Sequence, residues 1–430
     1  MSLLATQGRA HAQTSRPPQF VLLAFDGSLN LDRWRDTLQF AQDNDIKFTY
    51  FISGVYFLLD AKKRQYVEPT HGPGRSAIGF GGPKPEEIAE RIAWVNKAYD
   101  SGHEIGSHVN GHYDGTKWTY EQWSKEFDQF PHLVFDAVPN NGLTTLASSP
   151  FHFTPESIVG FRAPLLGHDA ATYEVLAARH FKYDTSKTAE MAYWPQREHG
   201  IWNFPLAQLR IAGTGKRTLS MDYNFYFAQS GGKEEPAREE EFRTEMLKTY
   251  LAYFANNYLG NRAPVHIGHH FGRWNGGAYW NAMQEFAKAV CHLPEVKCVT
   301  YRELSIYLDS LPKEALVAYQ EGRFEKSEFP EAAQALARAE PGIEADLVLH
   351  ASADSNIVSA EVAGAHAARV SADTGALTIW KIDGKTVASG AERTLDLSRH
   401  RHRLSAHSRL SVSVIKDGKE VLRSTHDIST

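Results

Sequence analysis

Short apolar runs alternate with segments of helical periodicity through most of this 430-residue chain. The first apolar run, Phe20–Phe25, precedes a helix-like segment, Leu31–Asp45, which is followed by an apolar and aromatic run, Lys47–Ser53. Repeated strand–helix units of this kind place successive strands in one parallel sheet with helices outside it. The alternation continues to about Leu311 and predicts an α/β fold whose sheet is closed or nearly closed.

The later elements of this region follow the same pattern. Gly54–Pro83, rich in Gly and Pro, is expected to be a long loop that forms a substrate-binding rim. Helices are predicted at Pro85–Ser101, Thr119–Val138, Asp169–His180, Glu239–Asn256, Ala278–Val290 and Glu303–Leu308, and strands at Ile158–Phe161, Phe181–Asp184, Ile201–Pro205, Val265–His269 and Val296–Thr300.

The character of the chain changes at Pro312. Residues 312–342 are rich in Ala and Glu and are expected to be a helical linker. Residues 343–430 alternate in hydropathy between turn signals such as Asp383-Gly384, which predicts a small all-β, sandwich-like domain. His400 and His402 alternate with Arg residues there, a pattern that favours a solvated basic strand face over a second metal site.

Composition excludes several classes of function. The net charge of −5 gives no basic field for nucleic acid or anionic lipid. No apolar run approaches the ~18 residues of a transmembrane helix.

Residues 1–17 resemble the trimmed end of a secretory signal, with Ala10-His11-Ala12 as its small-residue site. We therefore expect an exported protein, periplasmic or extracellular.

The chain has two cysteines, Cys291 and Cys298. A predicted helix ends near the first and a predicted strand contains the second, with a short loop between them. This layout can bring the sulfur atoms within bridging distance, and an exported protein favours a disulfide over two buried thiols.

Gly102–His112 contains two histidines four residues apart, His108 and His112. A helical turn in this segment would set both imidazoles on one face. Neutral imidazole is a common ligand of zinc, so the pair is a candidate for part of a metal site.

Four other segments place polar, titratable residues at the ends of strand-like runs, where α/β barrels keep their active sites. They contain Asp26, Arg162-Ala163-Pro164, Asp184 and the His269-His270 pair. In this order, and with the His108–His112 segment, they resemble the five motifs of the polysaccharide deacetylases, carbohydrate esterase family 4. The amino-acid sequence of the Arg162 segment is most similar to that of the chitin-deacetylase-like branch. The resemblance runs from about Pro18 to Leu311 and implies a distorted, incomplete (β/α) barrel.

The resemblance implies a role for each residue. His108 and His112 would bind a divalent metal, with zinc as the expected ion, and Asp26 would be the general base, held ionised by Arg162. A member of the His269-His270 pair would be the general acid, oriented by Asp184. The spacing from Pro264 favours His270, whereas the step of two from Ile267 favours His269, and both stay open.

Two aromatic or turn residues complete the candidate site. Pro164 is assigned to the substrate-binding turn after Arg162, although proline in such a position commonly acts only as a turn former. Trp274, close to the late histidine pair, is the best candidate for stacking on a sugar ring.

Gly27 departs from the family pattern, in which a second Asp follows the first and binds the metal. Three interpretations are open. Asp26 binds the metal and leaves the role of base vacant; or the metal is held by two histidines with water or a distant carboxylate such as Glu104 or Asp114; or catalysis is lost and carbohydrate binding is retained.

The favoured function is a metal-dependent hydrolase that removes N-acetyl groups from a chitin- or peptidoglycan-like polysaccharide. The alternative is a catalytically impaired protein of the same fold that binds carbohydrate. An amidase of small cyclic imides or ureides is a third, weaker hypothesis, because the long rim and the exported-type start favour a polymer. The sequence predicts no oligomeric state.

Overall fold

The computed structural model describes residues 15–324 except 145 and 148, and the segments 346–351, 357–363, 377–383, 385–390, 394–396, 408–416 and 419–428. The chain divides into two compact units. Residues 1–250 and 261–328 form the larger one, and residues 251–260 and 329–430 form the smaller one.

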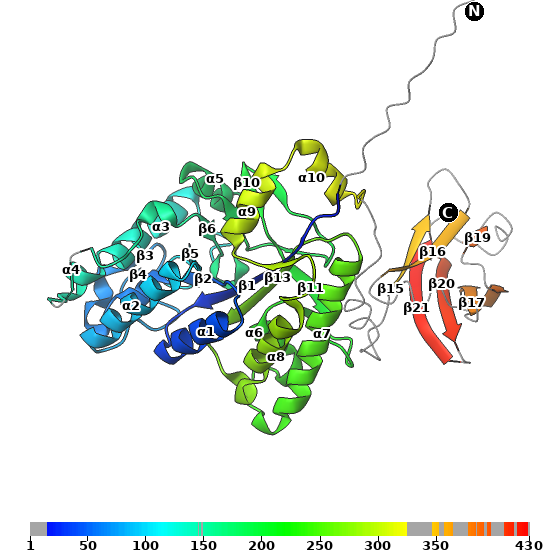
Figure 1. Ribbon diagram of the computed structural model, residues 1–430, viewed down its shortest axis with the longest axis horizontal. Helices are drawn as coiled ribbons and strands as arrows, with labels where there is room; N and C mark the ends of the chain where they lie inside the picture. Colours follow the sequence, from blue (N-terminus) through cyan, green and yellow to red (C-terminus); the bar gives the residue numbers. More distant parts are fainter. Residues whose placement is uncertain are drawn as a thin grey trace, which may run out of the picture. The chain divides into compact units, whose positions relative to one another are not determined.

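A curled, mostly parallel sheet is the centre of the larger unit (Figure 1). β9 is antiparallel to its neighbour, and β14 pairs with the start of β1. Among the described residues no pairing joins the two edges of the sheet, so the barrel is incomplete. The strand order is β13 (Val265–His270), β1 (Gln19–Gly27), β2 (Thr49–Ile52), β5 (Glu104–Ser107), β6 (Gly160–Phe161), β7 (Tyr183–Asp184), β10 (Ile201–Asn203) and β9 (Gln196–Glu198), with β14 at Val296–Cys298.

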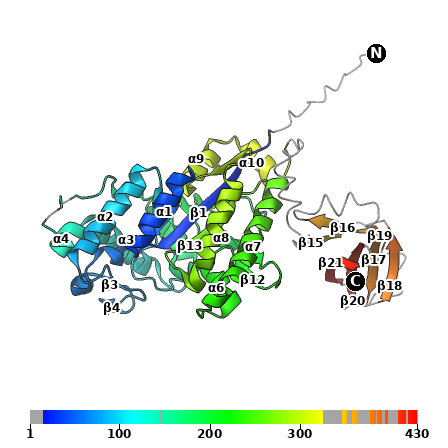
Figure 2. The same ribbon diagram turned by 60° about the horizontal axis from the view of Figure 1, so that its bottom comes forward.

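Helices pack around the outside of these strands, and α1 and α8 run beside β1 in both views (Figures 1 and 2). The helices are α1 (Leu31–Asp43), α2 (Pro85–Asp100), α3 (Tyr120–Phe135), α4 (Ala137–Asn141), α5 (Ala170–Ala178), α6 (Asp222–Ser230), α7 (Glu239–Leu259), α8 (Trp274–Val290), α9 (Tyr301–Ser310) and α10 (Lys313–Gln320). Each helix predicted from periodicity is present, whereas α6 was not predicted.

Smaller elements decorate this frame. The predicted Gly54–Pro83 loop contains two 3₁₀ turns, η1 (Gly54–Phe57) and η2 (Asp60–Gln65), and a short hairpin of β3 (Val67–Glu68) and β4 (Gly72–Pro73). A three-stranded sheet, also unpredicted, contains β12 (Arg217–Leu219), β11 (Leu206–Arg210) and β8 (Thr188–Ala189). The 3₁₀ turns η3 (Pro155–Ser157), η4 (Pro164–Leu166) and η5 (Pro236–Arg238) complete the unit.

The two faces of β1 explain why one polar residue ends an apolar strand. Leu22 and Ala24 face the interior of the barrel, where they pack in the main aromatic core with Phe51, Tyr183 and other buried side chains. Because side chains alternate along a strand, Asp26 lies on the same face as Leu22 and Ala24. The sheet therefore carries Asp26 to the carboxyl end of the barrel, above its own core.

The smaller unit contains two antiparallel sheets, as the all-β expectation requires. One has the order β15 (Asp346–Ala351), β16 (Ile357–Ala363) and β19 (Thr394–Asp396). The other has the order β18 (Lys385–Gly390), β17 (Leu377–Ile382), β20 (Ser408–Lys416) and β21 (Lys419–Ile428). Trp380, Ile382, Leu395, Leu410 and Val412 are buried.

These observations confirm the predicted fold class. The first part of the predicted linker is helical, as α10, while residues 325–345 and the His400–Arg403 strand face lie outside the described residues, as does most of the signal-like start. The proposed domain limits stay a prediction. In the described part of the chain, no helix is long and apolar enough to cross a membrane.

Cys291 and Cys298 form a disulfide that connects the end of α8 to β14. Replacing both by serine is expected to lower the free energy of unfolding by roughly 2 to 3 kcal/mol, the entropy of closing a loop this short in the unfolded chain. Thermal unfolding of the double variant, compared with the oxidised wild type, measures this loss, and the reduced wild type, which also lacks the bridge, is the control. Equal melting temperatures of oxidised wild type and variant would show that the bridge does not stabilise the barrel.

Candidate active site

Asp26 and Arg162 form a buried ion pair at the carboxyl end of the sheet. Arg162 Nη1 donates to Asp26 Oδ1 at 2.8 Å, and both side chains are almost fully buried. Burial lowers the pKa of Arg162, but the charge and hydrogen bond of Asp26, together with the nearby Tyr301 and Tyr183, outweigh burial and raise the pKa overall. The predicted pairing of these two residues is therefore present in the structure.

The rest of the guanidinium is held by the barrel core. Nε donates to Thr185 Oγ1 at 2.5 Å and Nη2 to the Tyr301 hydroxyl at 3.3 Å. The guanidinium carbon lies 4.7 Å from the ring centre of Phe51, within the range of a cation–π contact. Each part of the Arg162 side chain is thus restrained, and these contacts fix the direction from which its guanidinium approaches Asp26.

His108 and His112 lie close together, with ring centres 5.1 Å apart. His108 Nδ1 lies 2.7 Å from the carbonyl oxygen of Arg162, so this nitrogen carries the proton and Nε2 keeps a lone pair. Nε2 is buried and has no hydrogen-bond partner among the residues that the structure describes. Burial lowers the pKa of His108 to about 3, and burial and His270 lower the pKa of His112. Both imidazoles are therefore neutral near pH 7.

The residues between the two histidines are not helical. Val109 and His112 have positive φ angles of 42° and 60°, so the rings converge through an irregular loop. Glu126 of α3 holds this loop, because its carboxylate accepts from the backbone amides of Asn110 at 3.0 Å and Gly111 at 3.3 Å. Sequence reasoning missed Glu126, although its spacing of three from Trp123 and four from Phe130 places it on the buried face of α3.

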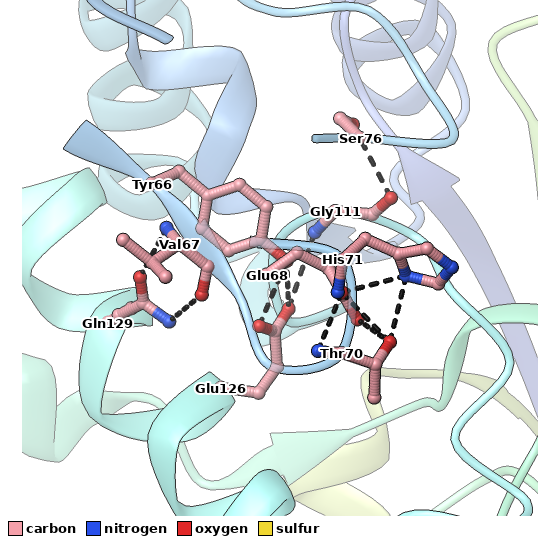
Figure 3. A network of polar contacts seen from close by, with 9 residues as sticks. All are labelled: Tyr66, Val67, Glu68, Thr70, His71, Ser76, Gly111, Glu126 and Gln129. Carbon is pink, nitrogen blue, oxygen red and sulfur yellow. Dashed lines mark hydrogen bonds and ion pairs between the residues drawn. The ribbon is translucent and has the colours of Figure 1, made fainter. Parts of the chain in front are cut away.

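Figure 3 shows how the rim reaches the same loop. The Tyr66 hydroxyl donates to the Glu126 carboxylate at 3.0 Å, and the backbone amide of Ala77 donates to the carbonyl oxygen of Gly111 at 2.8 Å. Burial raises the pKa of Glu126 to about 7, against the hydrogen bonds that favour its ionised form. The predicted rim therefore borders the histidine loop.

The register of β13 separates the two late histidines. Asp26 pairs with His270, so these side chains lie on the same face of the sheet. His269 points to the other face, where it is buried and packs against Phe25 and Tyr250. Among the two residues left open by the sequence, His270 is the one beside Asp26.

Asp222, at the start of α6, is the carboxylate that contacts His270. Its Oδ1 lies 2.7 Å from His270 Nδ1, and its Oδ2 accepts from the His270 backbone amide at 2.8 Å. Burial lowers the pKa of His270, but the charge and hydrogen bond of Asp222, together with the charge of Asp26, outweigh burial and raise it. Asp222 was missed because β12 before it has only three residues, too few to give a periodic signal.

Asp184 does not take the position expected for it. Its carboxylate accepts from the Tyr173 hydroxyl at 2.9 Å and from the Ser186 hydroxyl at 2.6 Å. Ser186 Oγ in turn accepts from the backbone amide of Ala163 at 2.8 Å. Asp184 therefore braces the turn that carries Arg162, and Asp222 has the place beside the late histidine.

The two predicted substrate residues have different surroundings. Pro164 is buried and begins η4, while the next residue, Leu165, is 66% exposed. Trp274 lies beside His270, with ring centres 5.6 Å apart, and stacks on Tyr226. Trp274 is thus next to the candidate acid. Pro164 begins the turn after Arg162, and its assignment to substrate binding stays a prediction.

The donor set fits a divalent metal in part. Two neutral imidazoles, one with an unpartnered Nε2, suit zinc. Gly27 has no side chain and therefore supplies no carboxylate to the metal. A Cβ atom added there would lie 3.6 Å from the Tyr56 ring, so the position has room for the first atom of a side chain. Within the described residues no group of three or more His, Cys, Asp and Glu side chains is placed to hold a metal.

Comparison with known proteins agrees with this geometry. Residues 13–141, which include Asp26, His108 and His112, match the family model described as polysaccharide deacetylase. The resemblance to the polysaccharide deacetylases is confirmed. The match does not distinguish the chitin-deacetylase-like branch from others, which stays a prediction. No curated protein matches the chain.

Several solved structures are similar to this chain over part of its length. A candidate polysaccharide deacetylase from Mycobacterium smegmatis is 14% identical, with 74% of this chain and 100% of that chain covered and a TM-score of 0.42. A family 4 carbohydrate esterase from Streptomyces lividans in complex with acetate is 12% identical (65% and 91% covered, TM-score 0.34). A pseudoenzyme of the same family from Bacillus anthracis is 7% identical (67% and 66% covered, TM-score 0.36).

The contacts of Asp222 predict the titration of His270. Asp222→Asn keeps a hydrogen-bond acceptor beside Nδ1 but removes the negative charge, so the pKa of His270 should fall. Asp184→Asn is the matched control, because Asp184 contacts Tyr173 and Ser186 instead. Histidine titration by NMR measures both. An unchanged His270 pKa in Asp222→Asn, or a lowered one in Asp184→Asn, would return the orienting role to Asp184.

Proposed function

We propose that the larger unit removes N-acetyl groups from an N-acetylated polysaccharide by hydrolysis. One observation carries this proposal: a base held by Arg162 and a histidine held by Asp222 lie on the same face of neighbouring strands, in register at Asp26 and His270. Amide hydrolysis needs both groups, one to take a proton from water and one to give a proton to the leaving amine.

Asp26 is assigned as the base. Its Oδ1 is occupied by Arg162, which leaves the second carboxylate oxygen for the attacking water. His270 is assigned as the acid, because the raised pKa keeps its imidazole protonated to higher pH than an ordinary histidine. The proton on its Nδ1 is held by Asp222, so Nε2 is the atom that donates to the amine nitrogen.

His108 and His112 would hold the metal. When bound there, a divalent ion such as zinc polarises the acetyl carbonyl and makes water more acidic. The contribution of the protein is to present two neutral imidazoles in fixed positions, since the Arg162 carbonyl orients His108 and Glu126 fixes the loop of His112.

A glycan-binding protein without catalysis is the second candidate, and Gly27 favours it. With two protein ligands in place of three, the metal is held more weakly, and too weak a site would leave binding as the remaining function. The exported location inferred from the first residues suits either function, because chitin- and peptidoglycan-like polymers lie outside the cell.

Acetate release from N-acetylglucosamine oligomers, with zinc supplied, distinguishes the two candidates. The wild type should release acetate, and Asp26→Asn should do so roughly 10²- to 10⁴-fold more slowly, the usual contribution of a general base. Calorimetric titration with the same oligomers should show that Asp26→Asn still binds them. Oligomer binding without acetate release by the wild type would support the glycan-binding alternative.

Zinc titration of variants at Gly27 tests the missing ligand. Gly27 has a φ of 85°, so both Gly27→Ala and Gly27→Asp should lose roughly 1 to 2 kcal/mol of stability. Of the two, the Asp variant should bind zinc more tightly than wild type, because it adds a charged ligand.

His112→Ala is the negative control of that titration and should abolish stoichiometric zinc. An unchanged zinc content in this variant would show that the metal is bound elsewhere. Equal affinities of the Ala and Asp variants would show that another group already occupies the position of the missing carboxylate.

A further inference from the structure

Two large side chains of α6 are exposed beside the candidate acid. Tyr223 is 47% exposed and Phe227 is 62% exposed. They are four residues apart on one helix and therefore lie on the same face, one turn apart. Exposed aromatic rings grouped on one surface commonly mark a site where a ligand binds.

Ring contacts join this pair to the candidate active site. The Tyr223 ring centre lies 6.1 Å from that of His270 and 5.5 Å from that of Trp274. Trp274 is itself stacked on Tyr226 at 5.2 Å with an interplanar angle of 4°. One ring of the exposed pair is therefore braced by a rigid aromatic cluster, and the other extends away from His270 along α6.

The chemistry assigned to His270 says what this surface should contact. In deacetylation the water activated by Asp26 attacks the acetyl carbon, the bond from that carbon to nitrogen breaks to release acetate, and the acid protonates the nitrogen, which stays attached to the sugar. The sugar ring must therefore lie on the side of His270, next to Tyr223, and the acetyl group on the side of Asp26 and His108.

We propose that Tyr223 and Phe227 form a platform for successive sugar units of the glycan, beginning at the unit whose N-acetyl group is removed. This inference rests on the proposed function. Pyranose rings have apolar C–H faces, which pack on aromatic faces because these carry partial negative charge. Tyr223 contacts the reacting unit and Phe227 the next one along the chain.

The platform predicts how binding depends on oligomer length. Tyr223→Ala should weaken the affinity for N-acetylglucosamine oligomers of every length by roughly 3- to 10-fold, the range expected for one aromatic contact. The loss in Phe227→Ala should grow with length, from little for the shortest oligomer to a similar factor for longer ones. Calorimetric titration and KM, measured with oligomers of two to six units, report these effects.

Matched variants separate stacking from a general loss of apolar surface. Phe227→Tyr should keep the wild-type affinity for long oligomers, whereas Phe227→Leu should lose as much affinity as Phe227→Ala. Ile306→Ala removes another side chain that is 61% exposed, on α9, and should leave every affinity unchanged.

Each outcome has a defined meaning. A wild type that binds and deacetylates oligomers, with Tyr223→Ala and Phe227→Ala binding them equally well, would overturn the platform and leave the proposed function intact. A wild type that neither binds nor deacetylates any oligomer would overturn the proposed function and the platform with it. Recovery in Phe227→Leu equal to that in Phe227→Tyr would overturn the stacking.

Discussion

The buried ion pair between Arg162 and Asp26 is the interaction on which the arrangement of the site depends. Removing two charges from water costs several kcal/mol per ion, which is recovered only when the remaining polar atoms are also bonded. Thr185, Tyr301 and the Phe51 ring meet that condition for the guanidinium. The backbone of the same residue fixes His108, because the Arg162 carbonyl oxygen accepts from Nδ1. Arg162 therefore sets the position of the base with its side chain and the orientation of a candidate ligand with its main chain.

Two other buried carboxylates support the loops that carry the candidate site residues. Glu126 bonds to the amides of the irregular loop before His112, and Asp184 reaches the Ala163 amide through Ser186. Both loops have positive φ angles at non-glycine residues, at His112 and at Leu165, which are conformations of low stability. Glu126 accepts from the amides directly and Asp184 acts through the Ser186 hydroxyl, so hydrogen bonds to the backbone hold both loops. The buried carboxylates around the site thus divide between candidate reacting groups and supports for their geometry.

The sequence predicts the barrel and most members of the site because both follow local rules. Apolar runs identify strands such as β1 and β13, and a titratable residue after such a run marks the end of the sheet that bears an active site. Asp222 could not be found in this way, since it follows a three-residue strand and comes near His270 only through the pairing of distant segments. His269 and His270 are likewise equivalent in sequence, and only the register with β1 shows which one faces Asp26. Sequence patterns do not show which distant segments pair, and this pairing decides which charged residues come into contact.

Because Gly27 removes a usual metal ligand, the site could be one that no longer catalyses a reaction. The free-energy cost of burying its charged and polar groups bears on that question. A binding surface of aromatic rings, such as that on α6, needs neither a buried ion pair nor a buried imidazole nitrogen without a partner. Well-packed apolar residues in place of a buried ion pair are commonly neutral or stabilising, and an unsatisfied buried polar atom costs about 1 to 3 kcal/mol. His108 Nε2 is such an atom, directed by the Arg162 carbonyl away from any bond within the described residues. Strain and unsatisfied groups of this kind concentrate where a protein does chemistry. The polar cost of the site therefore favours a working hydrolase with a weakened metal position over a glycan-binding relic.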